Sequence, residues 1–259
     1  MANTVQTRTY LRNECVVFRM TRERFGGLSN MASGFPLQVN GVRVWNAEAL
    51  YQACRFPHLP KVQEIIIRQR SPMTAKMRSK PYRKDSRPDW LNIRVKVMRW
   101  CLRVKLAENW EKFGELLLAT GDRPIVEKSR KDEFWGAKPK NNETLVGANV
   151  LGRLLMELRE ELRGPKRELL RRVELPEIAD LLFLGKPIKT IGARLLTSET
   201  TPSTTLEAEV IPHLPGSAEV TNGIDATGQE RQLSSASTET KESDMVKPGI
   251  VDPGFWTRQ

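Results

Sequence analysis

The sequence predicts an α+β fold, in which a mostly helical domain carries a short β-hairpin and a small sheet. Short apolar runs at residues 15–20 and 35–45 have the length of strands, whereas several stretches between residues 46 and 163 repeat their apolar side chains at helical spacing. No strand and crossover rhythm repeats along the chain, which argues against a doubly wound parallel sheet.

The strand signals are local. Residues 15–20 (CVVFRM) and 125–127 (IVE) are each expected to form a short strand, and residues 35–45 (FPLQVNGVRVW) alternate around Asn40-Gly41. That pair favours a type I′ hairpin turn, because both central residues of such a turn need positive φ.

Helices are predicted where a capping residue precedes an amphipathic stretch. The expected segments are a helix capped by Asn46, residues 61–70, a helix that starts at Ser71-Pro72, residues 89–106, and a helix from Asn109 to Ala119 that Gly121 ends. Between them, Arg83, Lys84 and Arg87 form a basic loop that suits phosphate contacts, although a solvated charge run is the default interpretation.

The stretch from Ser129 to Glu160 leads from a polar aromatic turn into a further helix. Leucines at positions 151, 154, 155, 158 and 162 form its apolar stripe, with Asn149 as the expected cap and Gly164-Pro165 as the stop. Gly147 and Asn149 at its start suggest either an anion site formed by backbone N–H groups or only a helix cap.

The chain divides into four parts by composition. Residues 1–14 are an N-terminal extension, 15–164 the main domain, 165–196 a helical appendage and 197–259 a disordered tail rich in Thr, Ser, Glu, Gly and Pro. We expect the apolar residues of 165–196 to form one or two helices that pack on the domain.

Net charge indicates the class of partner. The chain of 259 residues carries +11, but residues 197–259 hold ten acidic and four basic side chains, so residues 1–196 carry +17. Such an excess suggests nucleic acid or a phosphorylated ligand, against the alternative of a merely soluble cationic surface.

The rarer residue types limit the possible chemistry. Cys15, Cys54 and Cys101 are widely spaced in apolar runs and are expected to be buried thiols of a cytoplasmic protein, without a disulfide. The two histidines, His58 and His213, argue against a metal centre or a histidine triad, and no cofactor is expected. No apolar run is long enough for a membrane span, and the N-terminus lacks a secretory signal.

The helix after Asn46 presents one polar face. Glu48, Tyr51, Gln52 and Arg55 follow the i, i+3, i+4, i+7 spacing. A carboxylate placed there is a candidate acid or base, although a carboxylate in a first turn more often only stabilises the helix dipole.

Several short pieces together resemble the NADAR (YbiA-like) domain family over roughly residues 15–163. In chain order they are Leu28 to Asn30, Val44-Trp45, Ala47 to Ala53, Ser71-Pro72 to Lys76, Arg87 to Trp90, Val97-Met98, Lys105, Leu118 to Asp122, Val126-Glu127, Asp132 to Gly136 and Gly147 to Arg159. The resemblance implies a mostly helical α+β fold that cleaves N-glycosidic bonds and binds ligands of the NAD and ADP-ribose class.

One departure bears on the substrate. The family's bacterial small-molecule branch usually has Glu-His-Tyr where this chain has Glu48-Ala49-Leu50. The chain looks more like the branch that accompanies DNA ADP-ribosyltransferase toxins and removes ADP-ribose from guanine. The expected partners are therefore ADP-ribosylated DNA, single-stranded or with a flipped base, and a cognate toxin.

Cleavage of an N-glycosidic bond needs a negative group near an oxocarbenium-like carbon and a proton for the departing nitrogen. Glu48 and Asp132 are the candidate catalytic carboxylates, and Lys76 is a candidate Schiff-base amine if burial lowers its pKa. The candidate substrate-binding residues are Asn30, Tyr51, Gln52, Trp135, Gly136, Gly147, Asn149 and Arg159.

Two other hypotheses stay open. One is a small-molecule N-glycosidase that acts on phosphorylated riboflavin-pathway intermediates, as the other branch does. The other is a binding module for ADP-ribose or a toxin without catalytic activity.

Overall fold

The structure, a computed structural model, describes residues 6–192 and leaves residues 1–5 and 193–259 outside. Its α-helices are α1 (Ala47–Ala53), α2 (Pro60–Ile67), α3 (Pro72–Ser79), α4 (Trp90–Glu108), α5 (Trp110–Leu118) and α6 (Val150–Arg163). The 3₁₀ helices are η1 (Gly26–Leu28), η2 (Lys80–Asp85) and η3 (Arg167–Arg171). The predicted disordered tail lies outside the described residues.

The strands are short and pair in small sheets. They are β1 (Arg8–Leu11), β2 (Val16–Phe18), β3 (Leu37–Val39), β4 (Val42–Val44), β5 (Ile125–Glu127), β6 (Lys138–Pro139), β7 (Thr144–Gly147), β8 (Arg172–Val173), β9 (Leu182–Phe183), β10 (Lys186–Pro187) and β11 (Ile191–Gly192). An antiparallel sheet has the order β1-β7-β6, and β2 pairs with β5 in parallel. The predicted α+β fold is confirmed.

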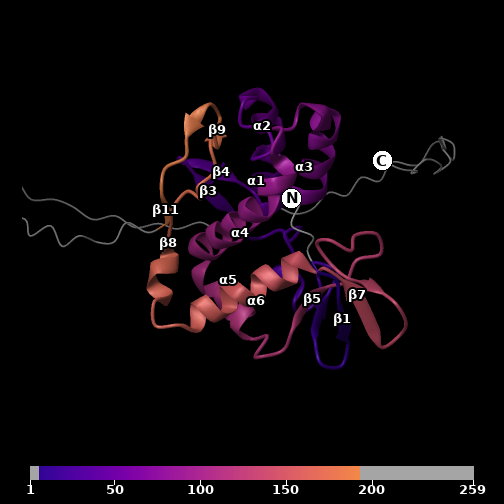
Figure 1. Cartoon of the computed structure of the whole chain (residues 1–259). Helices are drawn as coiled ribbons and strands as arrows, with labels where there is room; N and C mark the ends of the chain where they lie inside the picture. Colours follow the sequence, from indigo (N-terminus) through magenta and orange to yellow (C-terminus); the bar gives the residue numbers. More distant parts are fainter. Residues whose placement is uncertain (1–5, 193–259) are drawn as a thin grey trace, which may run out of the picture. The chain divides into compact units, whose positions relative to one another are not determined.

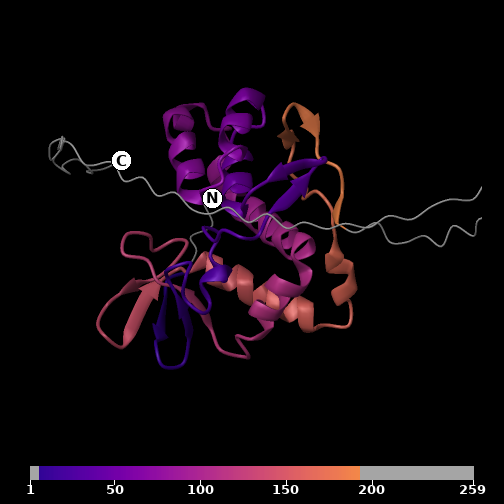
Figure 2. The ribbon, with the colours of Figure 1, turned by 180° about the vertical axis from the view of Figure 1, so that it is seen from behind.

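The helices α1 to α3 and the strands β1, β5 and β7 lie at different ends of the domain. Figure 1 shows α1, α2 and α3 together above α4, with β1, β5 and β7 beside α6, and Figure 2 shows the same arrangement from behind. α1 packs against α2, α3 and α4, while α6 packs against β5. The described cysteines, Cys15, Cys54 and Cys101, are all buried and free, as expected.

The local signals of the sequence are confirmed at the hairpin and at two helix starts. Asn40 and Gly41 have φ of 51° and 77°, as a type I′ turn between β3 and β4 requires. Asn46 caps α1 by accepting a hydrogen bond from the Ala49 amide, and Ser71 caps α3 by accepting one from the Thr74 amide.

The segment after α6 was predicted to be helical, and this prediction is wrong. Apart from the single 3₁₀ helix η3, its described residues form the two-residue strand pairs β8-β11 and β9-β10. Gln63 holds this segment by donating to the Leu182 carbonyl oxygen and accepting from the Leu184 amide. The buried Arg87, for which the sequence left a phosphate contact or a solvated charge run open, instead pairs with Asp89 and donates to the Ala179 carbonyl oxygen. The appendage therefore packs on the domain through these polar contacts and through buried apolar side chains such as Val173, Phe183 and Ile191, but not through a helix face.

A buried lysine fixes the loop that precedes β3. The ammonium of Lys105 on α4 donates to the carbonyl oxygens of Gly27 (2.6 Å) and Ser29 (3.0 Å). It also lies 4.4 Å from the ring centres of both Phe35 and Phe113. The loop that carries Asn30 is thereby attached to the longest helix of the described residues.

We expect Lys105 to make stability depend on pH. Burial, with a smaller effect of Lys112, lowers the pKa of Lys105 to about 7, whereas an unfolded chain has a lysine pKa of about 10.4. Between these values the unfolded state binds the extra proton, so the stability of the wild type relative to Lys105→Met should rise by about 1.4 kcal/mol per pH unit and be flat below pH 7. Urea unfolding across this pH window measures the difference.

The exposed Lys96 on the same helix supplies a matched control, since Lys96→Met should follow the wild-type pH dependence. Parallel stability curves for the wild type and Lys105→Met would contradict this interpretation of the buried ammonium.

Candidate active site

A cavity of about 320 Å³ opens where α1, α3, α4 and the turn after β5 meet. α1 supplies Glu48, Tyr51 and Gln52 of the face that the helical spacing singled out, and Arg55 follows in the turn after this helix. The loop after η1 contributes Asn30 and Met31, and the segment from Glu127 to Trp135 lines the opposite side. The predicted approach of the Glu48 helix to the Asp132 to Gly136 turn is therefore confirmed.

Glu48 is a buried carboxylate held by two amides. The residue is only 5% exposed, and its two carboxylate oxygens accept hydrogen bonds from Asn30 Nδ2 (2.8 Å) and Gln52 Nε2 (2.9 Å). Ser79 Oγ lies 2.9 Å from Gln52 Oε1 and 2.8 Å from the Lys76 carbonyl oxygen, so it shares its proton between them. Donors on both oxygens fit a carboxylate anion.

Glu127 is a second carboxylate of the cavity, which the sequence analysis did not include among the site residues. It ends β5, and burial raises its pKa to about 7, assisted by the negative charges of Asp132 and Glu48 and opposed by Lys76. A carboxylate at the end of a strand, just before a polar turn, was the signal available in the sequence. Near neutral pH this group can hold a proton, as a general acid must.

Asp132 shapes the turn more than it enters the cavity. Its residue is exposed, and Asp132 Oδ1 accepts hydrogen bonds from the amides of Phe134 and Trp135, both at 2.9 Å. The turn sets the Trp135 ring edge-on to Tyr51, with ring centres 5.7 Å apart. Burial followed by the charge of Glu48 raises the pKa of Tyr51, which keeps its hydroxyl neutral.

The cavity rim is cationic. Three carboxylates and five basic residues line the cavity. The basic residues are Arg55, Lys76, Arg83, Arg94 and Lys128. Arg55 lies over the Trp90 ring at 4.9 Å and Arg94 over the Phe134 ring at 3.7 Å, so aromatic faces orient both guanidinium groups. The arrangement suits a ligand with a neutral sugar near the acids and phosphates near the arginines.

A model of the NADAR domain family matches residues 17–163. The chain belongs to the NADAR domain family. Among its relatives, the "N-glycosidase YbiA" of Escherichia coli K12 is 35% identical over 152 residues, which are 59% of this chain and 91% of that protein. A "Riboflavin biosynthesis protein" of Vibrio vulnificus is 35% identical over 158 residues, which are 60% of this chain and only 41% of the relative. The NMR structure of E. coli YbiA, 34% identical, covers 59% of this chain and 90% of its own, with a TM-score of 0.49.

Seven of the eleven site residues expected from the sequence lie together in this NADAR cavity. They are Glu48, Asp132, Lys76, Asn30, Tyr51, Gln52 and Trp135. Lys76 is exposed on α3, so the burial that would favour a Schiff-base amine is missing. The other four, Gly136, Gly147, Asn149 and Arg159, do not line the cavity, and their positions explain why.

Asn149 supports the site from behind. It has a left-handed backbone (φ 48°) and makes no side-chain cap at α6. Its Oδ1 accepts from the Glu127 amide (3.1 Å), and its Nδ2 donates to the Ile125 carbonyl oxygen (2.8 Å). Asn149 is therefore a positioning residue for the strand that ends in Glu127, and not the expected helix cap.

The expected anion site at the start of α6 is occupied by the protein itself. The amides of residues 148, 149, 150 and 151 donate to the carbonyl oxygens of residues 133, 136, 134 and 135 at 2.7 to 3.1 Å. Gly136 and Gly147 belong to this junction, where a Cβ on Gly147 would collide with the Gly136 carbonyl oxygen. These N–H groups stabilise the turn instead of facing a phosphate.

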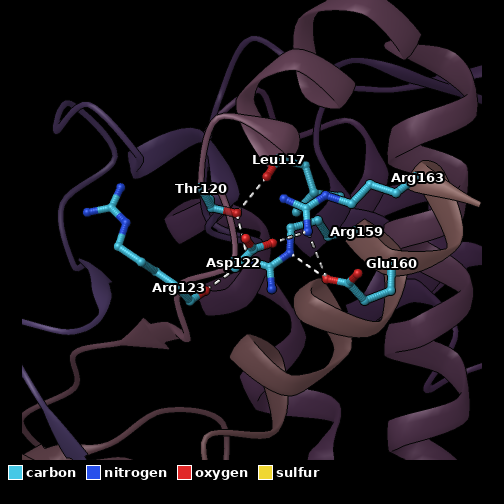
Figure 3. Close-up of polar contacts among 7 residues, drawn as sticks. All are labelled: Leu117, Thr120, Asp122, Arg123, Arg159, Glu160 and Arg163. Carbon is cyan, nitrogen blue, oxygen red and sulfur yellow. Dashed lines mark hydrogen bonds and ion pairs between the residues drawn. The ribbon is translucent and has the colours of Figure 1, made fainter.

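Arg159 stabilises the turn before β5, as Figure 3 shows. The residue is 4% exposed, and its Nη1 donates to Thr120 Oγ1 (2.9 Å) and to the Arg123 carbonyl oxygen (2.8 Å). Its Nε donates to Glu160. All of these partners are within the protein, so Arg159 is not available to the cavity.

Two features are absent from residues 6–192. Among them, no group of three or more His, Cys, Asp or Glu side chains is placed to hold a metal ion. None of the helices in this part of the chain is long and apolar enough to cross a membrane.

We expect the Asn149 contacts to stabilise the fold. Asn149→Gly tolerates the positive φ but leaves the Glu127 amide and the Ile125 carbonyl oxygen without partners, which should cost about 1–3 kcal/mol. Urea unfolding measures this loss against Asn142→Gly at an exposed site, which should cost about 0.5 kcal/mol or less. Equal stabilities of the two variants would refute the positioning role.

Proposed function

We propose that this NADAR domain is an N-glycosidase that removes ADP-ribose from guanine bases of DNA and so acts as the antitoxin of a DNA ADP-ribosylating toxin. The observation that carries the proposal is one cavity that combines the buried carboxylate of Glu48 and the partly buried carboxylate of Glu127 with a rim of arginines and lysines. Relatives named N-glycosidase support the reaction class.

The two carboxylates have complementary roles in this proposal. Glu48, with both oxygens accepting hydrogen bonds from amides, stabilises the positive charge that develops on the ribose carbon. Glu127, with its pKa raised to about 7, protonates the leaving guanine nitrogen. Asn30 Oδ1, which is buried without a partner among the described residues, accepts a hydrogen bond from a ribose hydroxyl.

The proposed reaction is a direct hydrolysis. The bond between the ribose carbon and the guanine nitrogen breaks, its electron pair stays on the nitrogen, and the proton of Glu127 joins that nitrogen. Water then attacks the ribose carbon and gives a proton to the Glu127 carboxylate. The products are free ADP-ribose and an unmodified guanine.

The positive charge supports a nucleic acid substrate. A cavity of about 320 Å³ is at the small end of ligand sites, so the reacting ribose fits inside while the phosphates extend over the rim. Arg55, Arg83 and Arg94 offer planar groups for those phosphates. The +17 charge of residues 1–196 then favours binding of a polyanion.

A second candidate is a small-molecule N-glycosidase acting on phosphorylated riboflavin-pathway intermediates. The names of two relatives favour it, one from Vibrio vulnificus and one from Zea mays, both called riboflavin biosynthesis proteins. Incubation with ADP-ribosylated single-stranded DNA and, separately, with such a metabolite distinguishes the two. Release of ADP-ribose supports our proposal, turnover of the metabolite alone supports the second candidate, and tight binding without any product indicates a binding module.

Replacement of Glu48 or of Glu127 should reduce turnover, each for a different reason. Glu48→Gln should lower kcat by about 10²-fold or more, because the neutral amide no longer stabilises the developing charge. Glu127→Gln should lower kcat and abolish the fall in rate above about pH 7 that the wild type shows as Glu127 loses its proton. Release of ADP-ribose measured from pH 5 to 9 gives both results.

Glu143→Gln removes a carboxylate from an exposed site outside the cavity and is the matched control. A Glu48→Gln enzyme with the wild-type rate would remove that carboxylate from the mechanism. A Glu127→Gln enzyme that still loses activity above pH 7 would assign the proton to another group.

Lys76 allows a test of the covalent alternative. Since this side chain is exposed, we expect Lys76→Arg to keep turnover within about tenfold of the wild type, and borohydride to trap no adduct during turnover. Mass spectrometry of the borohydride-treated protein checks this. A reduced ADP-ribosyl adduct on Lys76 would replace direct hydrolysis by the Schiff-base route.

A further inference from the structure

A second hollow, outside the candidate active site, contains an aromatic ring between two arginines. Trp45 follows β4, and the guanidinium carbons of Arg43 and Arg70 lie 4.2 Å and 4.7 Å from its ring centre. Ser33, Gly34, Pro36 and Ser71 complete the lining of this hollow, which measures about 470 Å³. We call Arg43, Trp45 and Arg70 the tryptophan platform.

The platform is positively charged and accessible. Arg43 and Arg70 are exposed, and among residues 6–192 no carboxylate lies within ion-pair distance of either. The exposed Lys112 adds a third cation at the edge, where its ammonium donates to the Gly34 carbonyl oxygen (3.0 Å). The charge complements a phosphate backbone, and the indole and guanidinium planes complement a base.

The platform is rigidly connected to the catalytic helix. Asn46, which is fully buried, uses its Oδ1 to cap α1 at the Ala49 amide and its Nδ2 to donate to the Arg70 carbonyl oxygen (3.2 Å). One loop also borders both hollows, since Asn30 and Met31 line the active-site cavity and Ser33 and Gly34 line the platform. A ligand can therefore contact both along the loop.

We propose that the tryptophan platform binds an unpaired nucleotide of single-stranded nucleic acid beside the nucleotide that occupies the active-site cavity. The base takes the place of one guanidinium on the indole face, and the displaced arginine pairs with the adjoining phosphate. The inference rests on the proposed function for its partner, because a strand whose modified guanine lies in the cavity continues into its neighbouring nucleotides. A duplex does not fit, since its bases are already stacked on one another.

The test uses the full chain and an unmodified fluorescent oligothymidine of about 12 nucleotides, with fluorescence anisotropy as the readout. Trp45→Leu should weaken binding by about tenfold or more. The double variant Arg43→Gln with Arg70→Gln keeps the ring and changes only exposed side chains. It should weaken binding and reduce the slope of log affinity against log salt by about 0.7, which corresponds to the one phosphate contact that the displaced arginine makes on a single strand.

Arg68→Gln is the control, because it removes an exposed arginine from the end of α2 outside the hollow and should bind like the wild type. Thermal unfolding establishes that each variant folds. Wild-type affinity in both folded platform variants, or equal loss for single-stranded and hairpin duplex probes, would overturn the inference.

The probe carries no ADP-ribose, so the outcome does not depend on catalysis. Suppose that the platform variants bind this probe more weakly than the wild type, but the wild type releases no ADP-ribose in the separate incubation with ADP-ribosylated single-stranded DNA. That result would refute the proposed function alone. Release of ADP-ribose with platform variants that bind and react like the wild type would refute the platform alone.

Discussion

The architecture around the site follows from the burial of one carboxylate. Taking the Glu48 carboxylate out of water costs several kcal/mol unless hydrogen bonds replace its hydration, and here Asn30 and Gln52 supply them. Each amide must itself be held. Lys105 fixes the Asn30 loop through two carbonyl oxygens, and Ser79 orients Gln52 from α3. A buried lysine and a buried serine thus belong to the same network as the acid, although neither lines the cavity.

The second carboxylate has the opposite environment. Glu127 is fixed through its backbone, by Asn149 and by the pairing of β5 with β2, and no amide side chain satisfies its carboxyl oxygens among the described residues. Burial and the nearby negative charges therefore disfavour the ionised form of Glu127, and together they raise its pKa to about 7. Two carboxyl groups whose environments differ in this way can divide the roles of anion and proton donor in one reaction.

The sequence predicted the features that depend on neighbouring residues. The Asn40-Gly41 turn, the caps at Asn46 and Ser71 and the polar face of α1 each need only a few adjacent side chains. It missed what depends on partners far along the chain, because Asn149 reaches back 22 residues to Glu127 and Arg159 reaches 39 residues to Thr120. An asparagine before a helix resembles a cap whether or not it makes one. The appendage was misassigned as helical because its apolar residues enter the core from short strand pairs and turns, which have no helical period.

Ala49 and Leu50 stand where the small-molecule branch usually has His and Tyr, and the sequence analysis used this departure to choose between the two branches. The structure shows how far the departure affects the cavity. Both residues are fully buried, and neither lines the cavity, since only Glu48, Tyr51 and Gln52 of α1 line it. The departure therefore does not change a residue that lines the cavity. What separates a nucleic acid substrate from a phosphorylated metabolite is how far positive charge extends beyond the cavity. A metabolite needs cations only at the rim, whereas in the proposed complex a strand that continues past the first nucleotide also reaches Arg43 and Arg70 in their separate hollow.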